Sequence, residues 1–279
     1  MNYSMIFFII GWVFIIEAAL MAPSALVAVL YSERSIWAFA AAIGLCLLLG
    51  VPLVRKQPAN KVFYAKEGCV TVALSWIVMS LMGALPFVFS GVIPSIVDAM
   101  FETVSGFTTT GASILKDVEV LPRCMLFWRS FTHWIGGMGV LVFLLCLLPM
   151  SGGGYSMNLM KAESPGPSVS KLVPKVRSTA KLLYGLYVAL SLLELTLLLL
   201  GSMPLFDALC TTFGTAGTGG FTVYNDGIAH YGSSLITYLV SIGVLVFGVN
   251  FNLYYYLMLR RVKAFFGDEE LRAYIKKAL

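Results

Sequence analysis

Charge is scarce in this chain of 279 residues: Asp, Glu, Lys and Arg make up only 12% of it. An ordinary soluble domain has about 25% charged residues. Apolar residues reach 59%, and the mean hydropathy is +0.87. A water-soluble fold of this size has no interior large enough to bury that excess. The composition excludes secreted disulfide scaffolds, disordered chains and nucleic-acid-binding proteins, and it predicts a protein embedded in a bilayer.

Cysteine and histidine are also sparse, with five and two residues. No C-x-x-C pair occurs and every cysteine lies in or beside an apolar run, which argues against a metal site or a disulfide framework. No covalently bound cofactor is expected. No cleavable signal peptide is expected, because the first apolar run lacks a basic leader and is too long for one. His133 has no evident serine and carboxylate partners, so an intramembrane enzyme built around it is the least favoured alternative.

Long apolar runs predict the membrane topology. A helix of about 20 apolar residues crosses the hydrocarbon layer of a bilayer. Two shorter segments, 95–106 and 205–215, are too short to cross and are expected to be re-entrant half helices. The predicted spans are residues 5–31, 35–54, 69–92, 129–150, 180–202 and 233–259.

The distribution of basic residues predicts the orientation. With a cytoplasmic N-terminus, 15 of the 19 Lys and Arg residues fall in segments 55–68 and 151–181 and in the tail after 259. Basic residues concentrate on the cytoplasmic side of membrane proteins. Both half helices then enter from the outside. The predicted location is a bacterial inner membrane, crossed several times.

An internal repeat relates the two half helices. An offset of 109 aligns Asp98 with Asp207, Thr109 with Thr218, and Gly111 with Gly220. Each unit is expected to contain a spanning helix, a half helix, a Gly/Thr loop and a second spanning helix, and the two units run parallel. Pro94 and Ser95 before the first half helix, Pro204 before the second, and an aspartate in the first turn of each indicate a helix start. Asp98 and Asp207 are alternatively cation ligands at a pore mouth.

The Gly/Thr loops, here called filter loop 1 (residues 108–113) and filter loop 2 (residues 217–222), are the candidate ion site. Non-helical backbone at membrane depth persists only when it is buried or lines a water-filled cavity. Neither loop contains a charged residue, and carbonyl oxygens can replace the hydration shell of a potassium ion. A packing turn is the alternative for one loop alone, but two loops at one offset favour a filter. The predicted ion-binding residues are Thr109, Thr110, Gly111, Thr218, Gly219 and Gly220, with K⁺ at Thr110, Gly111, Gly219 and Gly220.

These motifs resemble the TrkH family within the Trk/Ktr/HKT superfamily of potassium transporters. The resemblance covers essentially the whole chain. It rests on residues 101–112 (FETVSGFTTTGA), 127–139 (FWRSFTHWIGGMG), 162–167 (AESPGP) and 219–222 (GGFT). The two additional N-terminal spans favour TrkH over the sodium-dependent KtrB type, which stays an alternative.

The resemblance implies potassium uptake through one pore, with a filter glycine from each of four repeats. Here those glycines are Gly111 and Gly220. It also implies a homodimer over a cytoplasmic ring of nucleotide-binding TrkA-type subunits, faced by the basic segment 151–181 and the basic tail. Contact of these segments with anionic lipid is equally expected.

Two repeats are present where the family has four, so we expect a truncated chain; a non-conducting assembly partner is an alternative. The fold class is an all-α polytopic membrane protein. We expect an N-terminal helix pair in residues 1–54, the first pore repeat with its cytoplasmic loop in 55–178, and the second repeat with its basic tail in 179–279.

Other polar residues in the predicted spans carry further expectations. Arg129 and His133 are expected near the outer boundary, hydrogen-bonded behind the half helix together with Glu102. Intramembrane carboxylates are functional candidates by default; these are Glu17, where helix packing is favoured, and Glu194. Asn250 and Asn252 are expected to line the cavity below the filter. Gly136, Gly137 and Gly139 predict close helix packing or a bend.

Overall fold

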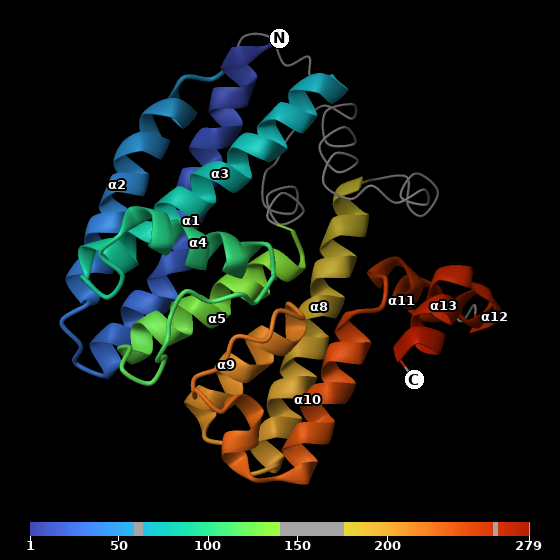
Figure 1. Ribbon diagram of the computed structural model, residues 1–279. Helices are drawn as coiled ribbons and strands as arrows, with labels where there is room; N and C mark the ends of the chain where they lie inside the picture. The colour runs from blue at the N-terminus through green and yellow to red at the C-terminus, as the bar shows by residue number, and fades with distance from the viewer. Residues whose placement is uncertain (59–63, 140–175, 259–261, 279) are drawn as a thin grey trace.

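The computed structural model describes residues 1–58, 64–139, 176–258 and 262–278, and within these ranges every regular element is helical (Figure 1). The α-helices are α1 (Tyr3–Leu30), α2 (Ile36–Arg55), α3 (Ala65–Phe89), α4 (Ile96–Phe107), α5 (Arg123–Gly137), α8 (Val176–Leu200), α9 (Leu205–Ala216), α10 (Ser234–Phe247), α11 (Phe251–Met258), α12 (Val262–Gly267) and α13 (Glu269–Ala278). A short 3₁₀ helix, η2 (Gly227–Tyr231), precedes α10. The predicted all-α class is confirmed.

Four of these helices are long and apolar enough to cross a membrane: residues Tyr3–Leu30, Ile36–Arg55, Lys66–Phe89 and Lys181–Leu200. They match four of the six predicted spans. α1 and α2 pack closely, because a Cβ on Gly50 of α2 would lie 2.9 Å from the carbonyl oxygen of Gly11 of α1. These two helices form the additional N-terminal pair beside the first repeat.

The predicted span 129–150 is wrong in its bounds. The helix starts earlier, at Arg123, where Glu33 of the α1–α2 connection accepts hydrogen bonds from the Arg123 and Cys124 amides at 2.6 and 3.0 Å. It ends at Gly137, and Gly139 has a φ of 75°, which a continuing α-helix excludes. The helix thus ends within the predicted run of Gly136, Gly137 and Gly139. Residues 140–150 lie outside the described residues.

The predicted span 233–259 is interrupted. α10 ends at Phe247, and α11 begins at Phe251. Two tyrosine hydroxyls bind carbonyls of the last turn of α10: Tyr254 donates to Val246 at 2.6 Å, and Tyr274 of α13 donates to Leu245 at 3.2 Å. Tertiary and local contacts thus satisfy carbonyl groups that a continued helix would use.

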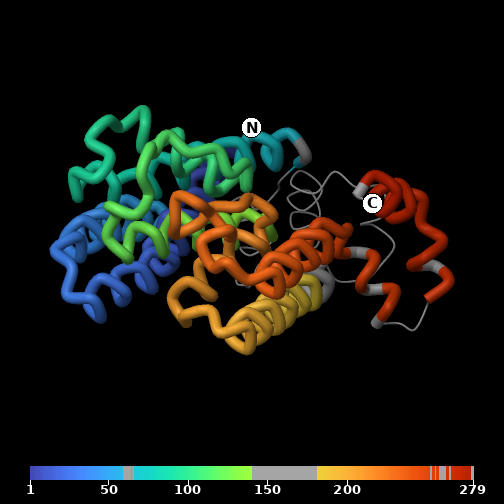
Figure 2. The backbone as a smooth tube through the Cα atoms, turned by 60° about the horizontal axis from the view of Figure 1, so that its bottom comes forward, coloured from blue at the N-terminus to red at the C-terminus, as the bar shows by residue number. Residues whose placement is uncertain are grey.

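The two repeats are α3–α4–α5 and α8–α9–α10, and their half helices agree with prediction. α4 and α9 each have 12 residues, or about 18 Å of helix, too short to cross a bilayer. The expected start of α4 is confirmed by Ser95, whose hydroxyl accepts from the Asp98 amide at 3.4 Å. α9 packs against both α5 and α8, which joins the repeats (Figure 1). Figure 2 shows the N-terminal pair at one end of the molecule and α11–α13 at the other.

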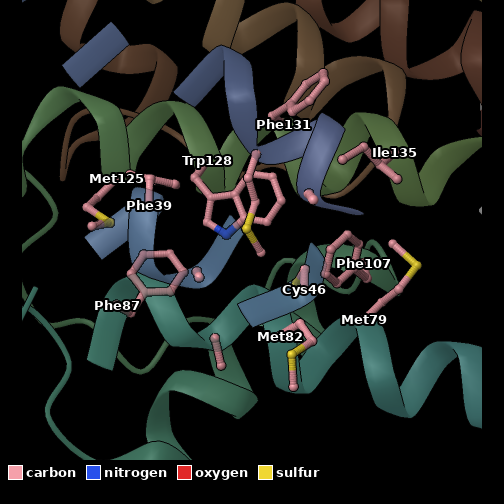
Figure 3. Packing of buried hydrophobic residues seen from close by; sticks show 14 of the residues in the cluster. Phe39, Cys46, Met79, Met82, Phe87, Phe107, Met125, Trp128, Phe131 and Ile135 are labelled. Carbon is pink, nitrogen blue, oxygen red and sulfur yellow. The ribbon is translucent and has the colours of Figure 1, made fainter. Parts of the chain in front are cut away.

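The core centres on Trp128 of α5, whose side chain is completely buried (Figure 3). Its indole N–H donates to the carbonyl of Gly83 on α3 at 2.9 Å. Phe39 of α2 and Phe107 of α4 meet its ring edge-to-face, with centroid distances of 6.3 and 6.1 Å. Such aromatic pairs add to the apolar burial. One side chain thus ties the N-terminal pair to the first half helix, and it holds the residue that immediately precedes filter loop 1.

Candidate ion filter

The two filter loops have the same backbone conformation. Thr109 and Thr218 have φ angles of 54° and 55°, and Gly111 and Gly220 have φ angles of 74° and 83°. A β-branched residue with positive φ is a genuine outlier, whereas glycine adopts this conformation readily. Strained backbone of this kind concentrates at functional sites. At these two pairs of positions the repeat found in the sequence is therefore also a repeat of backbone conformation.

Each half helix ends in a Schellman motif, in which two amides beyond the helix bond back to carbonyls of its last turn. In filter loop 1 the Thr109 amide donates to Gly106 at 3.0 Å and the Thr110 amide to Ser105 at 2.9 Å. The equivalent bonds of filter loop 2, at 2.9 and 3.0 Å, join Thr218 to Thr215 and Gly219 to Gly214. The chain therefore turns out of both helices in the same way.

The carbonyl groups that follow these turns are unused. Among the described residues, no group donates a hydrogen bond to the carbonyls of the six predicted ion-binding residues, Thr109, Thr110, Gly111, Thr218, Gly219 and Gly220. None of these six residues is buried. These oxygens, next to the negative ends of two helix dipoles, are free to accept water or bind a cation.

The two loops touch at their glycines. A Cβ on Gly111 would overlap the carbonyl oxygen of Gly219, so only glycine permits this approach. Thr110 and Gly220 are exposed, and Gly111 and Gly219 are half-buried. Within the described part of the chain the two loops therefore meet at Gly111 and Gly219 and leave Thr110 and Gly220 open.

A buried ion pair supports both loops from behind. Arg129 of α5 and Glu102 of α4 approach to 2.6 Å between Nε and Oε1, and both are almost fully buried. Glu102 also accepts from the Ser113 hydroxyl at 3.0 Å and the Ile114 amide at 3.0 Å, which holds the exit of filter loop 1. Arg129 donates to the carbonyl of Thr222 at 3.4 Å, at the exit of filter loop 2. The expected pairing of Arg129 with Glu102 is thus present.

His133 does not take the place expected of it. It lies ten residues into α5, about 15 Å along the helix, at the level of filter loop 2 rather than at the outer boundary. Its ring stacks on Phe221 with a centroid distance of 4.0 Å, and the Arg129 guanidinium lies 4.1 Å from the same ring. Within the described residues the Arg129 guanidinium donates to Glu102, Ser113 and Thr222, so the predicted Arg129–His133 hydrogen bond is wrong. A Cβ on Gly219 would lie 2.5 Å from the imidazole.

Two glycines near the end of α5 also permit a close approach, as predicted. A Cβ on Gly136 would overlap the carbonyl of Phe107, the last residue of α4, and one on Gly137 would lie 2.9 Å from Gly217. α5 therefore contacts the C-terminal ends of both half helices, and it fixes their separation.

Asn225 joins the two connections that leave the filter loops. Its amide nitrogen donates to Asp117 at 2.8 Å, its amide oxygen accepts from the Val118 amide at 2.9 Å, and its backbone N–H donates to Glu119 at 3.0 Å. The Asn225 hydrogen bond is the main reason that the pKa of Asp117 lies below its ordinary value. No sequence pattern identifies these residues, because the partners are more than 100 positions apart.

The other predicted polar sites are distributed as follows. Asp207, the alternative cation ligand, accepts a hydrogen bond from the Tyr224 hydroxyl at 3.3 Å. No cluster of three or more His, Cys, Asp or Glu residues that could hold a metal ion occurs in the described residues. Asn250 donates to Glu270 of α13 at 3.1 Å, and its expected place below the filter stays a prediction. The Asn252 side chain and segment 151–175 lie outside the described residues.

Known proteins share this sequence and fold. Residues 35–277 match the TrkH family, described as a cation transport protein. "Trk system potassium uptake protein TrkH" of Salmonella typhimurium is 35% identical over 99% of this chain and 58% of its own length. "Trk system potassium uptake protein TrkG" of Escherichia coli is 33% identical over 93% of this chain and 54% of its own. The crystal structure of the potassium transporter TrkH from Vibrio parahaemolyticus superimposes with a TM-score of 0.83 at 27% identity, covering 99% of this chain and 56% of that chain.

The chain thus spans a little over half the length of the curated relatives that it matches. The match includes both half helices, both filter loops and α5, and these relatives are transporters rather than enzymes. The chain belongs to the TrkH family of cation transport proteins.

Proposed function

We propose that this chain takes part in potassium uptake across the cell membrane, and that filter loops 1 and 2 supply half of a carbonyl-lined ion filter. The observation that carries the proposal is the pair of matching loops whose carbonyls accept no hydrogen bond from described residues. Cation binding by backbone carbonyls needs no charged side chain, and the filter loops contain none.

The residues proposed to bind K⁺ are Thr110, Gly111, Gly219 and Gly220, with Thr109 and Thr218 setting the loop conformation and contributing further carbonyls. The contact between Gly111 and Gly219 supports a shared site, because it brings the two loops to one place. Only one glycine per loop aligns between the repeats, so we expect weaker discrimination against sodium than a ring of four identical loops provides.

We also propose the assembly that the family resemblance implies. The protein would be a homodimer in a bacterial inner membrane, with a cytoplasmic N-terminus and a TrkA-type nucleotide-binding ring on the cytoplasmic side. The distribution of basic residues supports this orientation. No specific observation favours the assembly-partner or His133 enzyme alternatives: the His133 imidazole stacks on Phe221 and fills the space beside Gly219.

Rubidium and potassium flux into liposomes carrying the 279-residue chain tests the proposal, with sodium as the comparison. Gly111→Asp is expected to abolish the flux, because its side chain would enter the contact with Gly219. Gly232→Asp is the matched control: Gly232 also has positive φ, 55°, but lies in an outer connection with no neighbour within 4 Å of its Cβ position. Equal flux in both variants, or equal loss in both, would contradict the filter assignment.

A further inference from the structure

A buried carboxylic acid lies beside the second half helix. Glu194, six residues before the end of α8, is 5% exposed, and its Oε1 atom has no hydrogen-bond partner among the described residues. Gly243 of α10 makes room for it, since a Cβ there would lie 2.8 Å from both carboxyl oxygens and 2.7 Å from the Thr215 methyl group. The carbonyl of Thr215 accepts a hydrogen bond from the amide of Thr218, in the turn that leads into filter loop 2. The carboxyl group is thus one packing contact away from the filter.

A second buried carboxylic acid lies beside the first half helix. Glu17 of α1 is completely buried, and its Oε1 atom is 3.3 Å from the position of a Cβ on Gly83 of α3. The same position is 2.9 Å from the ring of Phe107, which ends α4 just before filter loop 1. This carboxyl group is therefore also one contact away from a filter loop.

The two sites are equivalent in the repeat. Gly83 and Glu194 each stand six residues before the end of their helices, at Phe89 and Leu200. Both helices then enter a turn with one positive φ, 73° at Gly91 and 66° at Ser202. Repeat 1 thus has glycine where repeat 2 has Glu194, and α1 brings in a carboxyl group from outside the repeat. A carboxyl group thus lies at the equivalent position of both repeats although it comes from a different helix in each, which indicates a shared role.

Neither carboxyl group has a basic partner. In the described part of the chain no Lys, Arg or His nitrogen lies within 4.0 Å of either one, and Arg129 is engaged with Glu102. The elements that pack around Glu194 carry the titratable residues Lys181, Tyr184, Tyr187, Asp207, Cys210, Tyr238, Tyr254 and Tyr256. Those around Glu17 carry Cys46, Arg55, Lys66, Glu67, Cys69, Arg123, Cys124, Arg129 and His133. Asp207 is bound by Tyr224, and Glu67 by the amides of Asn2 and Tyr64.

An ionised carboxylate buried without a partner is costly, so a group of this kind holds its proton until a positive charge comes near. We propose that Glu17 and Glu194 are proton-binding sites, one for each repeat, that lose their protons when a monovalent cation occupies the filter loops. The inference rests on the proposed function and deepens it. Because such coupling is reciprocal, a higher pH must strengthen cation binding. Two charges about 10 Å apart at a dielectric constant of about 20 correspond to a change of roughly tenfold in affinity.

Potassium affinity, measured by calorimetry on the purified chain between about pH 5 and about pH 9, tests the coupling. In the unmodified protein the affinity should rise toward alkaline pH by about tenfold for each of the two sites, or about a hundredfold in all. Glu17→Gln and Glu194→Gln should each reduce this dependence, and the double variant should abolish it. The matched control is Asp226→Asn, which removes an exposed carboxylate in an outer connection and should leave the dependence intact. Sodium in place of potassium reports whether the coupling follows the bound ion.

Infrared spectroscopy of the unmodified protein gives a second readout that does not depend on folding of the variants. A carbonyl band of buried, protonated carboxyl groups should be present without potassium and should weaken when potassium is added. Absence of such a band without potassium, or potassium binding with the same pH dependence in the double variant, would overturn the inference but leave the proposed function intact. No potassium binding by any of the proteins at any pH would contradict the proposed function, and the inference would fail with it.

Discussion

Arg129 and Glu102 form an ion pair, 2.6 Å between Nε and Oε1, that connects the exits of both filter loops. Burying two charges is costly, and removal of one partner leaves the other charge uncompensated. The pair therefore adds little net stability, but the loop geometry depends on both members being present. Phe221 extends the same unit, because the Arg129 guanidinium lies over one side of its ring while His133 stacks on it.

Replacement of Arg129 should expose this dependence. Arg129→Ala is expected to lower the free energy of unfolding by about 3–5 kcal/mol, because Glu102 would keep a buried charge without its partner. Unfolding in detergent micelles, followed by tryptophan fluorescence, measures the change. Arg123→Ala is the control on the same helix: Arg123 is exposed and lies over the Tyr31 ring at 4.4 Å, so about 1 kcal/mol or less is expected. Equal losses in both variants would argue against the supporting role of the ion pair.

The contact between Gly219 and His133 predicts a paired effect. Gly219→Ala should destabilise the protein by about 1–3 kcal/mol and reduce potassium flux, because its Cβ would lie 2.5 Å from the imidazole. His133→Ala creates the missing space, so the double variant should recover part of the loss caused by Gly219→Ala. A double-mutant cycle on unfolding free energies measures this coupling. Strictly additive losses would show that the two residues do not constrain each other.

The Asn225 contact predicts how the connections after the two filter loops respond to acid. The pKa of Asp117 is lowered in the folded protein, chiefly by the Asn225 side-chain hydrogen bond. A lowered folded-state pKa contributes stability above the unfolded-state pKa, and this contribution is lost as the pH falls through the folded-state value. Asn225→Ala should therefore raise the Asp117 pKa toward its ordinary value, as measured by carboxyl-carbon NMR. Asn250→Ala, far from this contact, should leave it unchanged; the same result for both variants would exclude the proposed cause.

Local patterns in the sequence are sufficient to predict the helices and the repeat. The half helices are evident because proline or serine precedes each one and a Gly/Thr loop follows. The ends of α5 and α10 are different, because tertiary contacts determine them. Nothing near position 247 indicates that Tyr254 and Tyr274 bind the carbonyls of that turn. Apolar length alone therefore predicts one continuous span where the structure has an interruption.

The candidate site divides in the same way. The filter residues are found by an offset between two segments, since each loop contains its own glycine and threonine signal. The supporting contacts join residues without any spacing rule, as Asn225 and Asp117 or Arg129 and Thr222 show. The sequence predicts a span that begins at residue 129, but α5 begins at Arg123. The expected position of His133 along the helix is therefore wrong as well. A pattern read along the chain finds repeated backbone, but contacts across the chain appear only in three dimensions.

The positive φ of Thr218 predicts a stabilising substitution. A β-branched residue at 55° stores about 1–3 kcal/mol of strain, and glycine removes it at an entropic cost of about 0.5–1 kcal/mol. Thr218→Gly should therefore raise the free energy of unfolding by about 1 kcal/mol. It should also lower the preference for potassium over sodium, because a more flexible loop holds its carbonyls less rigidly. Thermal unfolding and paired ion-flux measurements report the two effects.

Thr196→Gly provides the control with the opposite sign. Thr196 is exposed in the regular helix α8, so glycine there should lower the stability by about 0.5–1 kcal/mol and leave ion preference unchanged. If Thr218→Gly also lowers the stability, the turn conformation is not strained by threonine. If Thr218→Gly raises the stability but leaves the preference for potassium over sodium unchanged, the backbone at Thr218 is strained but does not determine selectivity. Only a gain in stability together with a loss of preference links the strained backbone to the filter.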